Sequence, residues 1–357
     1  MSTSGTGRPY DLVVYGSYGY TGKLVVRECL KRGLKVLLSG RNAASLEQQA
    51  SETGLPFLAV GIDDHSPLVE MLGQARVVLH CAGPFMQTAR QMSAACLAAG
   101  THYLDITGEH QVFQDLAGLN EQAVARGIVI MPGTGFDVVP TDCMAAYLKQ
   151  QMPDASGLLL AFGMKPTGVS RGTAKTALRS IGSTTLMRRG GKLVSETEEG
   201  RVMNIDFGPF TAPALRISWG DIVTAWHSTR IPDIEVHMAV NDRFLKRMRW
   251  TMAFRWLLKP AFVQRFLSRQ IDRRPAGPDE RVLQQGRSYI YGKVTSPTGQ
   301  AKEAWIEAGN GYALTAEMSV IIAQKLSHGT TLSGYHTPSS AFGADLILEG
   351  SGVVRRG

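Results

Sequence analysis

Over the first 140 residues, short apolar runs alternate with longer stretches in which apolar residues recur at helical spacing. The short runs predict strands, and the periodic stretches between them predict helices. The predicted strands are residues 11–15, 35–39, 56–60, 76–81, 102–106 and 128–131. The predicted helices are residues 21–32, 43–53, 67–73, 88–99 and 111–126, and four of them end at Gly33, Gly54, Gly100 and Gly127. This alternation predicts an α/β fold with a doubly wound, Rossmann-type parallel sheet.

The pattern changes after Gly135, where a predicted helix over 140–151 leads into strand-rich sequence such as "GLLLAFGM", "IEVHMAV" and "RSYIYGKVTS". The stretches "RGGK" and "SPTGQ" are typical of hairpin turns. The segment "ALTAEMSVIIAQKLS" is helical again. We therefore predict an NAD(P)-binding Rossmann domain over 1–140, a substrate domain of the α+β class over 141–310, and a C-terminal helix and tail over 311–357 that return to the Rossmann domain.

A glycine-rich loop separates the first predicted strand from the first helix. Gly16, Gly19 and Gly22 form a GxxGxxG pattern there. The first glycine permits a sharp turn, the second admits a pyrophosphate close to the backbone, and the third lets the helix pack near the sheet. The helix N-terminus offers unpaired N–H groups to the phosphates. We predict that a dinucleotide binds Gly16, Ser17, Tyr18, Gly19, Tyr20, Thr21 and Gly22.

The end of the second strand bears on the choice of dinucleotide. An NAD site favours an acidic residue there, which accepts from the ribose 2′-hydroxyl. Here the chain reads Ser39-Gly40-Arg41. An arginine can pair with a 2′-phosphate, so this stretch favours NADP, and the alternative is an ordinary solvated arginine.

Polar residues also follow the later strands. Asp63, after strand three, can cover the adenine, with a helix N-cap as the alternative. The stretch "HCAGPF" places Cys81, Ala82, Gly83 and Pro84 beside the expected nicotinamide ribose. "HYLDITGE" and "PGTGFDVVPTD" follow strands five and six. Ligands of open α/β sheets bind at this carboxyl edge.

Five stretches in the predicted Rossmann domain resemble the saccharopine dehydrogenase-like oxidoreductases, a family that includes trans-acting enoyl reductases. They are "YGSYGYTGKLVV", "LSGRN", "CAGPF", "HYLDITGE" and "GFDVVPTD". Farther along, "WGDIVTAWHSTRIPDIEV", "GYALTAEM" and "TPSSAFG" fit as well, the last resembling the enoyl reductases in particular. One departure is Ser17-Tyr18, where many members have Ala-Thr. The resemblance implies an NADP-dependent oxidoreductase.

Several side chains could move the proton that accompanies hydride transfer. We select Asp137, Asp105 and Tyr103 as catalytic candidates, with His102 as a further one and Glu109 as a residue that could orient an acid. Each has a structural alternative: Asp137 as a helix N-cap, Asp105 as a turn cap, and Tyr103 and His102 as strand residues packed in the core. No GxSxG elbow or closely spaced His/Cys set appears, which disfavours hydrolysis and zinc.

For the substrate wall we select Trp219, Asp221 and Thr229, with Ser228 and Arg230 beside them; the alternative is packing on a strand face.

The leading function is NADPH-dependent reduction of a C=C bond in an acyl or lipid-like substrate. The alternatives are C=N or C–N oxidoreduction of an amino-acid adduct and a non-catalytic NADP-binding regulator. An apolar tunnel would favour acyl chains, and converging arginines would favour amino-acid carboxylates.

Charge is concentrated in one segment. The chain has a formal net charge of +8, and residues 242–274 carry ten Lys or Arg against two Asp, mixed with large apolar rings. This pattern predicts a surface amphipathic helix pair, a peripheral membrane contact or a contact with an acyl carrier. No nucleic-acid recognition motif accompanies it.

Four dispersed cysteines and a polar leader predict a cytoplasmic protein. Whether the protein is a monomer or a homodimer is left open.

Overall fold

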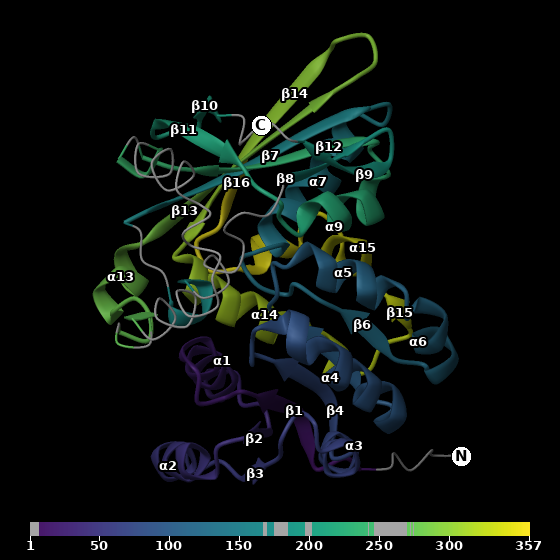
Figure 1. Ribbon diagram of the computed structural model, residues 1–357, viewed down its shortest axis with the longest axis vertical. Helices are drawn as coiled ribbons and strands as arrows, with labels where there is room; N and C mark the ends of the chain where they lie inside the picture. Colours follow the sequence, from purple (N-terminus) through teal and green to yellow (C-terminus); the bar gives the residue numbers. More distant parts are fainter. Residues whose placement is uncertain are drawn as a thin grey trace. The chain divides into compact units, whose positions relative to one another are not determined.

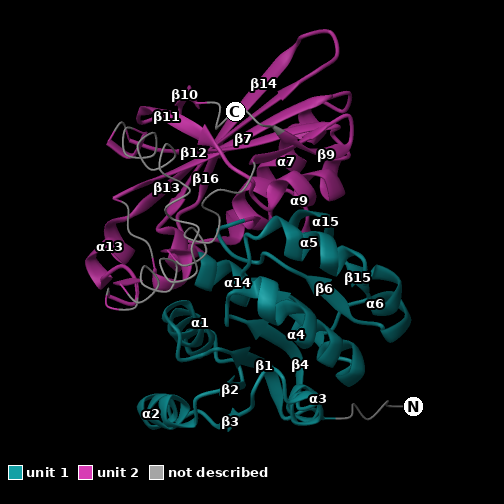
Figure 2. Cartoon of the chain, viewed as in Figure 1, with its two compact units in different colours: residues 1–137, 315–341 teal, residues 138–314, 342–357 magenta. Residues whose placement is uncertain are grey.

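The computed structural model describes residues 7–166, 170–174, 185–196, 202–241, 243–245, 270–271, 273 and 275–357. Most of the basic segment 243–274 lies outside these residues, so the predictions made on it stay predictions. The chain divides into two compact units (Figure 2). Unit 1 comprises residues 1–137 and 315–341, and unit 2 comprises residues 138–314 and 342–357.

Unit 1 is built on a sheet of seven parallel strands (Figure 1). Its order is β15-β6-β5-β4-β1-β2-β3, so the chain winds outward on one side of β1 and then on the other. The predicted doubly wound sheet is confirmed, and its order reverses between β1 and β4, where such sheets bind ligands. The strands are β1 (Tyr10–Tyr15), β2 (Val36–Gly40), β3 (Phe57–Ala59), β4 (Ala75–His80), β5 (His102–Asp105), β6 (Val129–Met131) and β15 (Gly334–Tyr335).

The helices of unit 1 connect these strands. They are α1 (Tyr20–Lys31), α2 (Ala43–Thr53), α3 (His65–Leu72), α4 (Phe85–Ala99), α5 (His110–Ala117), α6 (Asn120–Arg126), most of α14 (Gly311–Ser327) and most of α15 (Pro338–Phe342). The prediction of one helix over 111–126 is wrong, because α5 ends at Gly118 and α6 begins after Leu119. Glycine has a low helix propensity, which accounts for the break.

Two features of unit 1 were not predicted. Strand β15 joins the sheet beside β6, but two residues carry no alternation by which a sequence could reveal a strand. Arg8 lies in the stretch taken as a loose polar leader. Its guanidinium instead donates to the carbonyl oxygens of Ala75, Ala99 and Gly100, which ties this stretch to the end of α4.

Unit 2 contains a mixed sheet, which confirms the predicted α+β class. Along its main path the order is β10-β11-β12-β7-β13-β14-β16; only β12 and β7 run parallel there, and β8 pairs with β12 and with β9. The strands are β7 (Gly157–Lys165), β8 (Thr185–Arg189), β9 (Lys192–Glu196), β10 (Val202–Asp206), β11 (Thr211–Arg216), β12 (Asp233–Ala239), β13 (Arg287–Thr295), β14 (Ala301–Gly309) and β16 (Val354–Arg356). The helical elements are α7 (Val139–Gln151), α9 (Asp221–Thr229), α13 (Glu280–Gln285) and the 3-10 helix η1 (Leu346–Glu349).

Both predicted hairpin turns are confirmed. Gly190 and Gly191 join β8 to β9 with φ of 54° and 77°, and Gly299, with φ of 86°, lies in the turn between β13 and β14. These left-handed conformations favour glycine, which is why the turns were visible in the sequence.

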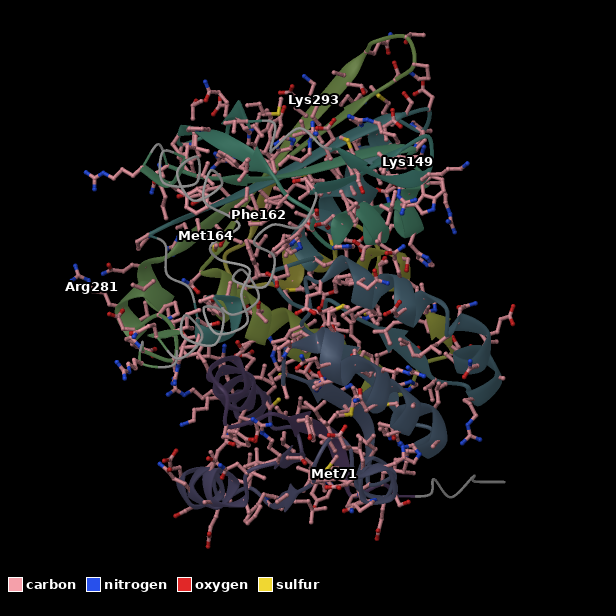
Figure 3. The ribbon with its side chains drawn as sticks, viewed as in Figure 1. Met71, Lys149, Phe162, Met164, Arg281 and Lys293 are labelled. Atoms are coloured by element: carbon pink, nitrogen blue, oxygen red, sulfur yellow. The ribbon has the colours of Figure 1, made fainter. Side chains whose placement is uncertain are left out.

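Each unit has its own packed core. In unit 1 the central strands are buried, and Met71 of α3, labelled in Figure 3, belongs to the hydrophobic cluster beneath them. In unit 2 α7 packs so closely on the sheet that a Cβ at Gly292 would lie 2.5 Å from Met144 Cγ. Across the described part of the chain, we find no helix with the length and apolar character needed to span a bilayer.

Candidate cofactor site

At its first glycine, the glycine loop has no room for a side chain. Gly16 follows β1 with φ of +81°, and a Cβ there would lie 2.9 Å from Ala82 Cβ. The Gly16 N–H donates to the Ser39 carbonyl oxygen at 2.7 Å. The loop is therefore held between the end of β2 and the segment that follows β4.

The other two glycines differ in what surrounds them. A Cβ at Gly22 would lie 2.3 Å from the Gly16 carbonyl oxygen, so α1 packs directly on the loop. A Cβ at Gly19 would meet only that same oxygen, at 3.2 Å. Gly19 is the N-cap of the 12-residue helix α1, and no side chain caps its first turn. The open side at Gly19 and the first-turn N–H groups fit a pyrophosphate.

The side chains of the loop brace it against its neighbours. Ser17 is fully buried, and its hydroxyl donates to the Gln49 side-chain oxygen of α2 at 2.7 Å, while Gln49 donates back to the Ser17 carbonyl at 3.0 Å. Tyr18 is half-buried against Gly40. Its hydroxyl oxygen accepts from the Asn42 N–H at 3.3 Å. Ser17 and Tyr18, which differ from the Ala-Thr of many family members, therefore both connect the loop to neighbouring segments.

Arg41 follows β2 and is exposed, and within the described part of the chain its guanidinium makes no ion pair. Asn42 caps α2 by accepting from the Ser45 N–H at 2.9 Å. The segment that carries Arg41 is therefore anchored on both sides, while the cation itself faces water. This geometry fits the predicted contact with a 2′-phosphate.

In the loop after β3, Asp64 makes the hydrogen bond that holds the turn. Asp64 accepts from the Gly61 N–H at 3.1 Å and stands at the N-cap position of α3, but its carboxylate makes no capping bond to the helix. Asp63 is exposed and accepts from the Gln91 side chain at 3.4 Å. The proposed adenine contact of Asp63 stays a prediction.

A clamp of two side chains holds the predicted nicotinamide loop, residues 81–84. The Thr88 hydroxyl donates to the Ala82 carbonyl oxygen at 3.0 Å and lies 3.3 Å from that of Pro84. His80 Nε2 lies 2.8 Å from the same hydroxyl. Burial lowers the pKa of His80 to about 3, so the ring is neutral. The Cys81 N–H donates to the Tyr15 carbonyl oxygen at 2.8 Å, and burial raises the pKa of the Cys81 thiol.

Asp105 is fully buried at the end of β5 and organises the loop after β6. Its carboxylate accepts from the Tyr103 hydroxyl at 2.6 Å and from the Thr107 and Gly133 N–H groups at 2.9 Å each. Burial raises its pKa to about 6, against the effect of these hydrogen bonds. The Tyr103 ring is fully buried in the core, which confirms the structural alternative given for it. His102 accepts a hydrogen bond from the Val129 N–H at 2.9 Å. Asp105 therefore has the contacts of a positioning residue.

Asp137 follows the loop that Asp105 holds. Thr315 supports the loop from α14: its hydroxyl accepts from the Phe136 N–H at 2.9 Å, and a Cβ at Gly135 would lie 2.6 Å from its methyl group. Burial and then the negative charge of Glu109 raise the pKa of Asp137 to about 7. The N-cap of α7 is Val138, so the N-cap alternative for Asp137 is wrong. Glu109 itself accepts from the Met86 N–H at 2.9 Å.

The predicted substrate residues lie in unit 2 on or beside α9, so the alternative that placed them on a strand is wrong. The Trp219 ring lies 5.4 Å from that of Phe162, a β7 residue labelled in Figure 3. Asp221 is fully buried at the start of α9, and Thr229 donates to the Ala225 carbonyl at 2.6 Å near its end. Ser228 donates to Asp142 at 2.5 Å, and Arg230 ends the helix with φ of 59°. Their role toward a substrate stays a prediction.

A cluster of charged residues on three strands of unit 2 was missed. Glu235 of β12 pairs with Arg189 of β8 and with Arg216 of β11, the latter at 2.9 Å. His237 Nε2 lies 3.3 Å from the same carboxylate. Burial works to raise the pKa of Glu235, but hydrogen bonds from His237 and Arg189 and the charge of Arg216 lower it to about 2. Glu235 and His237 lie two residues apart on β12, but only strand pairing brings Arg189 and Arg216 to them.

Comparison with known proteins agrees with this geometry. Residues 12–131 match the family model described as the saccharopine dehydrogenase NADP binding domain. The chain is similar to the saccharopine dehydrogenase-like oxidoreductase of Homo sapiens, with 31% identity over 59% of this chain and 53% of that protein. It is also similar to the trans-acting enoyl reductase of Mycobacterium bovis, with 26% identity over 97% of both chains.

A solved structure extends the likeness in fold. Saccharopine dehydrogenase (L-Glu forming) from Saccharomyces cerevisiae matches with a TM-score of 0.65 over 95% of this chain and 96% of that one, at 12% identity. This chain spans about half the length of the first curated relatives that it matches.

The glycine loop, the cation after β2 and the matched domain define a NADP-binding Rossmann protein. This domain is that of the saccharopine dehydrogenase family model, and the chain is similar to saccharopine dehydrogenase-like oxidoreductases, so the predicted resemblance, fold and cofactor are confirmed.

Proposed function

We propose that this protein uses NADPH to reduce the C=C bond of an α,β-unsaturated acyl or lipid-like substrate. The observation that carries the proposal is the similarity to a trans-acting enoyl reductase along 97% of both chains. The saccharopine dehydrogenase-like relatives, in contrast, match over little more than half of this chain. When bound, NADPH supplies a hydride to the β-carbon, and the α-carbon then takes up a proton.

Asp137 is the residue that best fits the role of proton donor. Its raised pKa, about 7, leaves a sizeable protonated fraction near neutral pH, which is the property that a general acid needs. Asp105 fits less well, because its carboxylate accepts three hydrogen bonds and is fully buried. We assign Asp105 and Tyr103 to holding the loop that presents Asp137.

The buried arginines bear on the alternative amino-acid substrate, whose carboxylates would require free guanidinium groups. In the described part of unit 2, the two buried arginines already have partners. Arg216 pairs with Glu235, and Arg188 donates to the carbonyl oxygens of Ile222 and Gly191. This supports an acyl substrate over an adduct of amino acids.

The test offers NADPH deuterated at the transferred position together with a short or a long trans-2-enoyl thioester. We expect the saturated product to carry one deuterium on the β-carbon, as measured by mass spectrometry. Asp137→Asn should lower the turnover about a hundred-fold or more, and the wild-type rate should fall as pH rises above about 7. Turnover of an imine formed from an amino acid and a keto acid, with none of the thioesters, would support the alternative. NADPH binding without turnover of either substrate class would contradict both.

A further inference from the structure

Tyr18 extends from the glycine loop onto the segment that follows β2. A Cβ at Gly40 would lie 2.6 Å from Tyr18 Cε1 and 3.2 Å from its hydroxyl oxygen. The phenol ring therefore lies directly on Gly40, the residue before Arg41. Substituting Gly40 with any larger residue would displace the ring.

The Tyr18 hydroxyl can both accept and donate. It accepts from the N–H of Asn42, the residue after Arg41, at 3.3 Å. A phenol has one O–H donor in addition to its acceptor lone pairs. In the part of the chain that the structure describes, no acceptor takes the Tyr18 hydroxyl proton. The proton is thus available to a ligand.

Two donors consequently stand at the end of β2. Tyr18 contacts the residues on both sides of Arg41, and the Arg41 guanidinium is exposed without an ion pair among the described residues. We propose that the Tyr18 hydroxyl is a direct ligand of the adenosine 2′-phosphate and binds it together with Arg41. A phosphate accepts several short hydrogen bonds from charged and neutral donors at once. This inference concerns the cofactor and rests on the NADP site, so it does not depend on the substrate proposed above.

The experiment is a set of titrations of the full-length protein with NADPH and with NADH, without any substrate. Tyr18→Phe keeps the ring on Gly40 and removes only the hydroxyl. We expect its affinity for NADPH to fall about ten-fold, since a hydrogen bond to a charged group typically contributes that much. Its affinity for NADH should stay unchanged, because NADH has no 2′-phosphate.

The matched control is Tyr10→Phe, the same change at the opposite end of β1, which should alter neither affinity. A second arm repeats Tyr18→Phe in an Arg41→Gln background, where the hydroxyl should matter less because the two donors share one ligand. Thermal melting of each variant checks that the fold is intact.

An unchanged NADPH affinity in Tyr18→Phe would overturn the inference and leave the ring as a packing element only. An equal loss for both dinucleotides would overturn it too, by showing that Tyr18 acts on the loop and not on the phosphate. Equal wild-type affinity for NADPH and NADH would remove the 2′-phosphate site itself. None of these results bears on whether an enoyl substrate is reduced.

Discussion

Arginines in the two units of this protein have opposite surroundings. Arg41, after β2 of unit 1, is exposed and makes no ion pair within the described part of the chain. Arg216, on β11 of unit 2, is 3% exposed and pairs with Glu235 at 2.9 Å. A cation left without a protein partner at the ligand edge of a parallel sheet is available for binding, whereas a buried and paired cation stabilises the fold.

The sheets explain the difference. Every strand of unit 1 runs in the same direction, so all the loops that follow its strands meet at one edge. In unit 2 neighbouring strands mostly run antiparallel, so loops leave the sheet at both ends. Residues of unit 1 that are far apart in sequence are therefore gathered for binding by topology alone.

The largest effect is expected from Gly19→Val. Gly19 has φ of −66° and ψ of 166°, which any residue adopts, and its Cβ would meet only the Gly16 carbonyl oxygen. The protein should stay folded while its affinity for both dinucleotides falls about a hundred-fold or more, equivalent to about 2.7 kcal/mol. Gly73→Val, at a helix end in the same unit, is the control for folding. Normal dinucleotide binding by a folded Gly19→Val protein would contradict the site.

Reversal of the cofactor preference is expected from Arg41→Asp. The new carboxylate repels a 2′-phosphate and can accept from a ribose 2′-hydroxyl. The affinity for NADPH should fall about ten-fold, and NADH should then bind more tightly than NADPH. Calorimetric titration gives both constants, and melting should show that stability is unchanged. A variant that still preferred NADPH would show that Arg41 does not contact the phosphate.

In contrast to Arg41→Asp, Glu235→Gln should lower the stability of the protein without altering its affinity for the cofactor. Removing the carboxylate takes the Glu235 charge away from the buried Arg216 guanidinium, which should lower the free energy of unfolding by about 3 kcal/mol. Denaturant unfolding measures the loss, and an NADPH titration is the control. If the variant were as stable as the wild type, the charged cluster would not contribute to the stability of unit 2.

The Arg216–Glu235 ion pair also predicts that the stability of the protein depends on pH. The pKa of Glu235 is about 2 in the folded protein, against an ordinary value of 4.5. Its contribution is therefore fully present above pH 4.5 and is lost as the pH falls through about 2. Wild-type stability should show this loss in acid, and Glu235→Gln should lack it.

The smallest effect is expected from Thr88→Val, which removes the hydroxyl that holds the Ala82 carbonyl oxygen and lies against that of Pro84. The loop is predicted to lie beside the nicotinamide ribose, which both dinucleotides share, so both affinities should fall about three-fold, the value of one ordinary hydrogen bond. Thr88→Ser should restore them. A loss of affinity for NADPH alone would contradict this, because it would place the loop near the 2′-phosphate and not near the nicotinamide.

Much of unit 1 was predictable from sequence because its signals are local. The glycine spacing, the arginine after β2 and the glycines that end helices each lie within a few residues of the structure that they specify. The split between α5 and α6 was missed because Gly118 lies inside an otherwise helical pattern. The role of Tyr18 was beyond reach, since its partners Gly40 and Asn42 come from another segment of the chain.

In unit 2 the sequence predicted the class and both hairpins but not how side chains pair. Helix α9 was not predicted, because Asp221 to Thr229 mixes β-branched and aromatic residues, which are typical of strands. The cluster around Glu235 depends on the register of β8, β11 and β12, and that register follows from tertiary packing.

The most direct test of the central claim, that the edge of the unit 1 sheet is an NADP site, is a pair of titrations of the wild-type protein. NADPH and NADH are titrated in parallel at the same ionic strength, since the predicted contact is electrostatic. The Arg41 cation and the glycine loop predict binding of both dinucleotides, with NADPH bound about ten-fold more tightly or better. Equal affinity for the two, or no binding of either, would contradict the account.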